Sequence, residues 1–336
     1  MAGPTVDAVS GLLLGLNTNF RETYDREITQ PAEPLPNLMK LALPSDGAYE
    51  REQYWESLPQ PQRWDRGKDI PRDTFKGRVW TTKILDWAIA IPIHENDIND
   101  SRVGSLLDRA GQAASGFAVL VERVFFQLLT AATDALLLDS IPLCPDGAAL
   151  FSATASGAAR FGKTGGNIVQ SDGIDNQEQV KSSFYKAMVR QLSFTDTKGQ
   201  TQINPKMLSQ GYTIVYPLQH KEVFDETFGS NLALKMFLNA SGDPAAATAI
   251  QNVLTRGDIP VTLWGSPRLT SDSWYIGLNG YPTKGIYQYE RQAPRDNISD
   301  MLNSDRARTK KEIVVQYDSR EGYGYALPIP LMKVSG

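Results

Sequence analysis

One long stretch limits what this chain can fold into more than any other. Residues 105–135 contain no proline, and their apolar side chains recur at intervals of three and four. This spacing predicts an amphipathic helix with one buried face. Ser105 and Asp108 have the spacing of a capping box at its start, and Pro142 prevents a longer helix. Such a helix is roughly 45 Å long, so we expect it to act as a strut.

The composition is that of a globular protein and excludes several classes of function. The 336 residues include 34 basic and 38 acidic ones, without a dense basic stripe, which argues against sequence-specific DNA binding. Cys144 is the only cysteine, so no intrachain disulfide is possible and we expect a cytoplasmic origin. No segment approaches the ~18 continuous apolar residues of a membrane span, and no basic flank precedes the first apolar run. We expect neither signal-directed export nor membrane insertion.

Two segments before the long helix predict surface that a monomer would leave uncovered. Apolar residues at helical spacing predict a weak amphipathic helix over 5–25, and the prolines between 31 and 44 predict an extended arm. Between Tyr49 and Ile93 the pattern predicts a long hairpin, whose return limb alternates apolar and polar residues from Val79 onward. Arm and hairpin would be ordered best against a neighbouring chain.

Four of the six tryptophans lie in this predicted hairpin. They either cover a local core or anchor a contact between subunits, where tryptophan is over-represented, and both interpretations stay open. The candidates for such a contact are Trp55, Trp64, Arg66, Trp80 and Trp87.

The segment GAARFGKT, residues 157–164, matches the phosphate-binding pattern G-x-x-x-x-G-K-[ST]. That chemistry needs a buried strand before the loop and a helix after it, with the lysine on the terminal phosphate and the threonine on magnesium. Two glycines follow instead, and the next helical pattern begins at Glu178. We favour an ordinary loop, and a nucleotide hydrolase is the alternative. Its binding residues would be Gly157, Gly162, Lys163 and Thr164.

Patterns of other catalytic or metal sites are absent from the sequence. Residues 94–100, HENDIND, concentrate three carboxylates but lack the ligand spacing and glycine of a calcium loop, so a turn with capping carboxylates is favoured. His94 and His220 are the only histidines, and we place His220 at the surface. Neither G-x-S-x-G nor H-E-x-x-H occurs. We therefore expect that the protein is not an enzyme and that it binds neither a cofactor nor a metal ion.

The second half of the chain alternates predicted helices and strands. A helix follows Asp175, which can cap it together with Glu178. We further expect a buried strand in YTIVYP with a helix after it, a strand-turn-strand unit in IPVTLWGSPRLTSDSWYIGL, a polar, loop-rich stretch over 291–309, and a final strand in which Gly322 and Gly324 mark a bulge or bend.

Several segments together resemble the major capsid proteins of tailed phages, most closely the Mu-like prophage major head subunit family. They are YWESLPQPQRW, WAIAIPIHENDINDSRVGSLLDRAG, PDGAALFS with a later GGN, QGYTIVYPLQHKEVF, SPRLTSDSWYIG and REGYG, in the family's order from about 49 to 325. One departure is that similar proteins usually have a histidine after the LFS phrase, where this chain has Ala153, Thr154 and Ala155.

The resemblance implies the Hong Kong 97 phage capsid fold, which is of the α+β class. It places an N-terminal arm at 1–48, an extended hairpin loop at 49–93 and an axial domain at 175–309. A peripheral domain would comprise 94–174 and 310–334, with the helix of 105–135 as its spine.

The function that this resemblance implies is structural. The chain would assemble as hexamers and pentamers into an icosahedral phage head around double-stranded DNA, which it would contact without sequence preference. Scaffold, portal and decoration proteins would be further partners, the virion capsid the location, and the host cytoplasm the place of assembly. A nanocompartment shell like an encapsulin, with the same fold around a protein cargo, is a second alternative.

Overall fold

The computed structural model describes residues 6–29, 34–55, 63–64, 69, 77–94, 96, 103–132, 137–153, 161, 166–196, 198–229, 232–238, 244–251, 259–296 and 312–336. The helical elements are α1 (Val6–Thr29), α2 (Leu35–Leu38), α4 (Val103–Thr130), α5 (Gln177–Leu192), α6 (Pro205–Leu208), η1 (Leu218–His220), α7 (Lys221–Phe224) and η2 (Asp225–Gly229). The strands are β1 (Met39–Pro44), β2 (Tyr49–Trp55), β3 (Gly77–His94), β4 (Ile168–Gln170), β5 (Tyr212–Pro217), β6 (Leu232–Leu238), β7 (Pro244–Gln251), β8 (Val261–Ser266), β9 (Trp274–Leu278), β10 (Ile286–Asp296), β11 (Glu312–Tyr325) and β12 (Leu331–Ser335).

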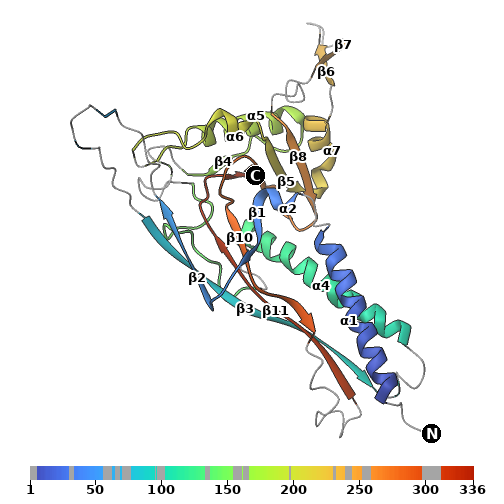
Figure 1. Ribbon diagram of the computed structural model, residues 1–336. Helices are drawn as coiled ribbons and strands as arrows, with labels where there is room; N and C mark the ends of the chain where they lie inside the picture. The colour runs from blue at the N-terminus through green and yellow to red at the C-terminus, as the bar shows by residue number, and fades with distance from the viewer. Residues whose placement is uncertain are drawn as a thin grey trace.

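Two five-stranded sheets form the body of the protein (Figure 1). The first has the strand order β1-β10-β11-β3-β2, and its long strands run diagonally across Figure 1. The second has the order β4-β12-β9-β5-β8, and α5 and α7 pack on it. Strands β6 and β7 pair only with each other among the described residues. Mixed helices and sheets confirm the predicted α+β class.

Helix α4 lies where the two sheets meet. The apolar side chains of its last three turns are buried, and they share one core with Val215 and Tyr275 of the second sheet and with Ile286 and Tyr323 of the first. The Tyr325 hydroxyl donates to the Leu128 carbonyl oxygen at 2.6 Å, which fixes β11 against the helix end. By length and composition residues 104–130 could cross a membrane, but 61% of the most apolar window is buried inside the protein. The apolar stripe is therefore that of a core helix.

The predicted bounds of this helix, 105–135, were wrong at both ends. The helix begins at Val103, so Ser105 lies inside it and is not its cap. It ends at Thr130 because Ala131 adopts a left-handed conformation with φ of 52°, which stops the helical hydrogen-bond ladder. The chain then turns back, with Leu137 N donating to the Gln127 side chain at 3.0 Å and Leu138 buried in the core.

The N-terminal segment packs on its own chain, unlike the expected arm over 1–48. Helix α1 is longer than predicted and lies along the first half of α4, with Phe20 stacked on Tyr317 at 3.8 Å between ring centroids. Strand β1 pairs in parallel with β10 at the edge of the first sheet. The prolines therefore do not prevent residues 34–44 from joining the fold, since β1 is an edge strand and ends at Pro44.

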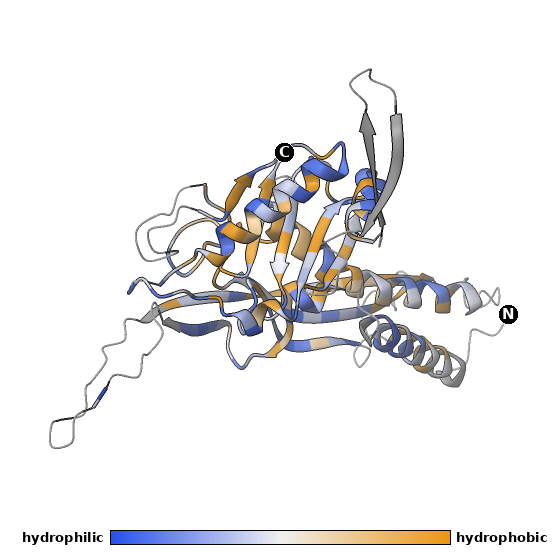
Figure 2. Cartoon of the chain, turned by 90° about the horizontal axis from the view of Figure 1, so that it is seen from above, coloured by the Kyte–Doolittle hydropathy of each residue, from blue (hydrophilic) through white to orange (hydrophobic). Residues whose placement is uncertain are grey.

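The predicted hairpin is confirmed in its limbs and is shorter than expected. Strands β2 and β3 pair from Tyr49 with Lys83 to Trp55 with Gly77. The second half of β3, from Ile84 to His94, instead pairs with β11 inside the first sheet. The hairpin limbs leave the protein at the end opposite the α1–α4 pair (Figures 1 and 2).

The predicted elements of the second half are mostly confirmed. Strand β5 is buried along its whole length, and β8 and β9 lie on either side of it. The true cap of α5 is Asn176, whose side chain accepts from Gln179 N at 3.0 Å, and not Asp175. Strand β10 continues to Asp296, into the stretch predicted to be loop-rich. The predicted peripheral segment 310–334 contributes to both sheets. Its strand β11 pairs with β3 in the first sheet, and its strand β12 pairs with β9 in the second.

Gly322 and Gly324 mark a close approach of two strands and not a bulge. Strand β11 keeps an unbroken register against β3 up to Gly322. A Cβ atom on Gly322 would lie 2.6 Å from Ile84 Cδ1 and 2.8 Å from the Lys83 carbonyl oxygen. A side chain at this position has no room, so glycine is required by packing.

We therefore predict that Gly322→Ala destabilises the protein by about 1–3 kcal/mol through overpacking. The control is Gly104→Ala in the first turn of α4, where a Cβ meets nothing within 4 Å. That change should raise the free energy of unfolding by up to about 1 kcal/mol, because alanine is the better helix former. Urea denaturation of both variants checks this, and equal stability of Gly322→Ala and wild type would contradict the packing argument.

Candidate assembly surfaces

The ribbon formed by β2 and the first half of β3 has one face open to solvent. Along β3, Val79, Thr81 and Lys83 point outward and alternate with residues that point toward the protein. Val79 is 57% exposed, and Tyr49, which pairs opposite Lys83, is 60% exposed. Tyr49 and Val79 therefore leave apolar surface open on a face whose other residues, such as Arg51 and Thr81, are polar.

The inward face of the ribbon holds a small core of its own. Ile84 packs with Tyr287, Tyr289 and Ala326, and Trp80 lies partly buried against them. Trp87, further along β3, is also partly buried and meets Tyr323 edge to face at 6.3 Å between ring centroids.

Of the five interface candidates, those that the structure describes differ in how far they are buried in their own chain. Trp80 and Trp87 contact the core of their own chain, which fits the local-core interpretation for these two residues. Trp64 is 53% exposed and is the candidate best placed for a contact with another chain. The side chain of Trp55 and the whole of Arg66 lie outside the described residues. An interface role of Trp64 stays a prediction.

A shallow pocket of about 230 Å³ lies beside the ribbon. It is bordered by Trp80 and Lys83 of β3 and by the loop of Asp139 and Leu143. Lys83 Nζ forms an ion pair with Asp139, and both side chains are largely exposed, so solvent screens the pair. Leu143 is 59% exposed and adds open apolar surface beside the ribbon.

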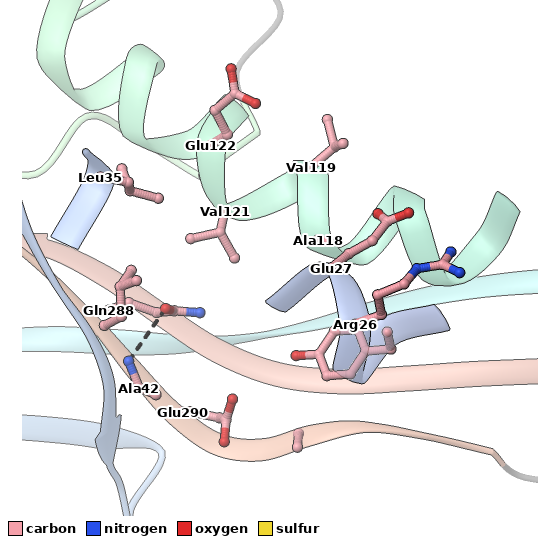
Figure 3. A pocket seen from close by; sticks show the side chains of 13 residues that line it. Arg26, Glu27, Leu35, Ala42, Ala118, Val119, Val121, Glu122, Gln288 and Glu290 are labelled. Atoms are coloured by element: carbon pink, nitrogen blue, oxygen red, sulfur yellow. Dashed lines mark hydrogen bonds between the residues drawn. The ribbon is translucent and has the colours of Figure 1, made fainter. Parts of the chain in front are cut away.

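A larger groove of about 590 Å³ lies between α1, α4 and the β1–β10 edge of the first sheet (Figure 3). Leu35, Leu41, Val119 and Val121 supply apolar wall, and Val119 is 38% exposed. Ala42 N donates to the Gln288 side-chain oxygen at 3.4 Å on the floor. We call this cavity the α1–α4 groove.

Two carboxylates with perturbed ionisation lie on and beneath the floor of this groove. Glu321 is 2% exposed and accepts from Gln288 Nε2 at 3.0 Å and from the Tyr323 hydroxyl, yet its burial raises the pKa of the carboxyl. Burial, and then the nearby Glu321 carboxylate, raise the pKa of Glu290. Burial and both carboxylates raise the pKa of Tyr24 on α1. Ionisation of each of these groups is therefore disfavoured, by burial first and by the neighbouring acidic groups second.

The nucleotide-loop residues Gly157, Gly162, Lys163 and Thr164 lie outside the described residues. Their described surroundings do not have the strand-loop-helix order that the motif needs. Residues 151–153 form no strand, the extended residues 168–170 form strand β4, and the next helix begins at Gln177. The structure therefore disfavours a phosphate-binding loop at this place.

No group of three potential metal ligands occurs among the described residues. Of the acidic segment 94–100, only His94 and Asn96 are described. His220 is partly exposed, as predicted for a surface residue, and its Nε2 lies 3.0 Å from Asp272 Oδ1. No nucleophile stands beside this pair in the interactions of the described residues, so it forms no triad.

Neither the α1–α4 groove nor its carboxylates were predicted from the sequence. The groove is assembled from segments that are separated by up to about 270 residues in the chain, so no local sequence pattern predicts it. Glu321 had a signal, because it follows Val315, Tyr317 and Ser319 at period two on the buried face of β11.

No protein-family model matches the chain, and no curated protein matches it. Solved structures do. The capsid of a native GTA particle aligns with a TM-score of 0.51 at 13% identity, over 90% of each chain. A structure from Microbacterium phage Oxtober96 gives 0.50 at 13% identity, over 90% of this chain and 91% of the other. The procapsid of bacteriophage JBD30 gives 0.50 at 13% identity, over 99% of this chain and 76% of the other.

These likenesses extend over nearly the whole chain, so they define its fold as that of phage capsid proteins. The Hong Kong 97-type architecture predicted from the sequence is thereby confirmed. At 13% identity the likeness concerns the fold alone.

The buried carboxylate predicts a pH dependence of stability. A group whose pKa is raised by folding contributes stability that is present at low pH and is lost as pH rises through its folded pKa. We expect the free energy of unfolding of wild type to fall relative to Glu321→Gln as pH rises from about 5 to 8, because the glutamine stays neutral and can still accept from Tyr323. Urea denaturation across this range checks the sign, and a parallel pH dependence of the two proteins would contradict it.

Proposed function

We propose that this protein is the major capsid protein of a tailed phage or related particle, which assembles as hexamers and pentamers into an icosahedral shell around double-stranded DNA. The observation that supports this most is the capsid fold over nine tenths of the chain. The structures with this fold come from a capsid and a procapsid, which are assembled shells. The role is structural and non-enzymatic, and the protein resides in the virion capsid after assembly in the host cytoplasm.

The surfaces of the protomer favour assembly. The open ribbon face lies at one end of the molecule, and the α1–α4 groove lies on a different part of the first sheet. Contacts between unlike surfaces of identical copies are head-to-tail, and these close into rings when the rotation permits. Hexamers and pentamers are rings of this kind. We therefore assign the ribbon, with the predicted hairpin loop 49–93, to contacts between neighbouring subunits.

Partners besides other copies follow from the same proposal. DNA would be held by confinement, because a chain with a net charge of −4 gains little from phosphate contacts. Scaffold, portal and decoration proteins are expected at the shell, and membership of the Mu-like head subunit family stays a prediction. The peripheral and axial domain assignments belong to this proposal as well.

Electron microscopy of the purified protein under assembly conditions tests the function. We expect shells, rings or tubes, and only small monodisperse particles would contradict the proposal. Particles from an infected or induced host should contain nuclease-protected double-stranded DNA. Particles that hold a protein cargo and no DNA would indicate the nanocompartment alternative instead.

The predicted contact of the hairpin loop 49–93 is tested by a pair of tryptophan variants. We predict that Trp64→Ala leaves the free energy of unfolding within about 0.5 kcal/mol of wild type, because the side chain is half exposed. It should raise the protein concentration needed for assembly by about tenfold or more, as expected for an aromatic interface anchor. Trp87→Ala is the control, and it should cost about 3 kcal/mol of protomer stability because Trp87 packs in the core. Unchanged assembly of Trp64→Ala would remove this residue from the contact.

A further inference from the structure

The α1–α4 groove has walls that suit the stem of a long side chain. Val121 of α4 points toward the β1–β10 edge, Val119 lies at the outer rim of the groove, and Leu35 lies at one end (Figure 3). These walls are apolar, and the groove is open to solvent at Val119, which is 38% exposed. The aliphatic part of a lysine or arginine side chain packs well on such walls while its charged end seeks an anion.

Three carboxylates border the groove, and two of them have partners within the protein. Glu122 accepts from Arg268 Nε at 3.0 Å, and Glu27 accepts from the Ser115 hydroxyl at 2.6 Å. Arg26 is exposed in the last turn of α1 and supplies one guanidinium to the lining.

Glu290 is different because no ion pair within the described residues includes it. It is half-buried, and the buried Glu321 lies behind it. Both surroundings disfavour its ionised form. Covering this carboxylate with an apolar surface alone would increase its desolvation cost, whereas covering it with a cation would offset that cost. The chemistry of the groove therefore selects a basic occupant.

Resting on the function proposed above, we propose that the α1–α4 groove receives a lysine or arginine side chain from a second copy of this chain, which pairs with Glu290. The occupant and the groove are unlike surfaces, so the contact is head-to-tail and suits a ring of copies. The sequence contains a strongly basic run to supply such a side chain, since four of the six residues 306–311 are lysine or arginine and none is acidic. This run lies outside the described residues, and the test below does not depend on which basic residue is used.

The first measurement is thiol protection. Cys144 is the only native thiol and is buried, so a cysteine placed by Val119→Cys labels against a low background. We expect Val119→Cys to react with a small maleimide in protomers and at least tenfold more slowly in assembled shells, with full reaction after the shells are denatured. Equal rates in shells and protomers would overturn the proposal.

The second measurement separates charge from shape. Glu290→Gln keeps the size of the side chain and removes the charge, so protomer stability should be unchanged or higher. The concentration needed for assembly should rise about tenfold, which is the effect of losing a charge-assisted hydrogen bond. The difference should shrink at high salt, where the pair is screened. Glu178→Gln, an exposed change in the first turn of α5, is the matched control and should assemble like wild type.

The outcomes distinguish this proposal from the proposed function. If wild type forms shells and Glu290→Gln assembles equally well at low salt, the basic occupant is wrong and the shell function stands. If shells form and Val119→Cys stays fully reactive, the groove is not an interface. If wild type forms no shell under any assembly condition, the shell function and the groove contact both fail.

Discussion

The burial of α4, along one face for most of its length and all round over residues 124–129, is the constraint on which the rest of the structure depends. Its first half is covered by α1 and by β3 and β11, and its second half is enclosed by strands from both sheets. Its apolar side chains belong to two of the hydrophobic cores, and each Å² of apolar surface removed from water contributes about 25 cal/mol to folding. The second half of the helix therefore joins the two sheets through one shared core.

The same arrangement explains how much could be predicted from the sequence. Elements with a strong period were found, such as the buried strand β5 and the alternating strand β3, because a single face of each is buried. The end of α4 was missed because it depends on Ala131 and on the return of Leu138 to the core, which are tertiary effects. The N-terminal segment was expected to lie on a neighbour, and prolines alone cannot tell whether an edge strand pairs within its own chain.

The candidate surfaces divide in the same way. The concentration of tryptophans drew attention to the predicted hairpin, and the structure then separated Trp64 from Trp80 and Trp87 by burial. The α1–α4 groove joins residues of α1, β1, α4 and β10, so only the fold brings them together. Glu321 illustrates a signal that alternation along a strand can supply, since a carboxylate at a position of the buried face indicates an unusual site.

The length of β3 has a mechanical consequence. This strand runs for 18 residues, with its first part in the ribbon and its second part in register with β11 through 11 consecutive pairs. A force applied along the ribbon pulls β3 parallel to its neighbour, so the ladder hydrogen bonds are loaded together and resist as a group. A force that peels the ribbon sideways loads them one at a time. The protomer is therefore expected to resist tension along β3 more strongly than a force that bends the ribbon out of the sheet.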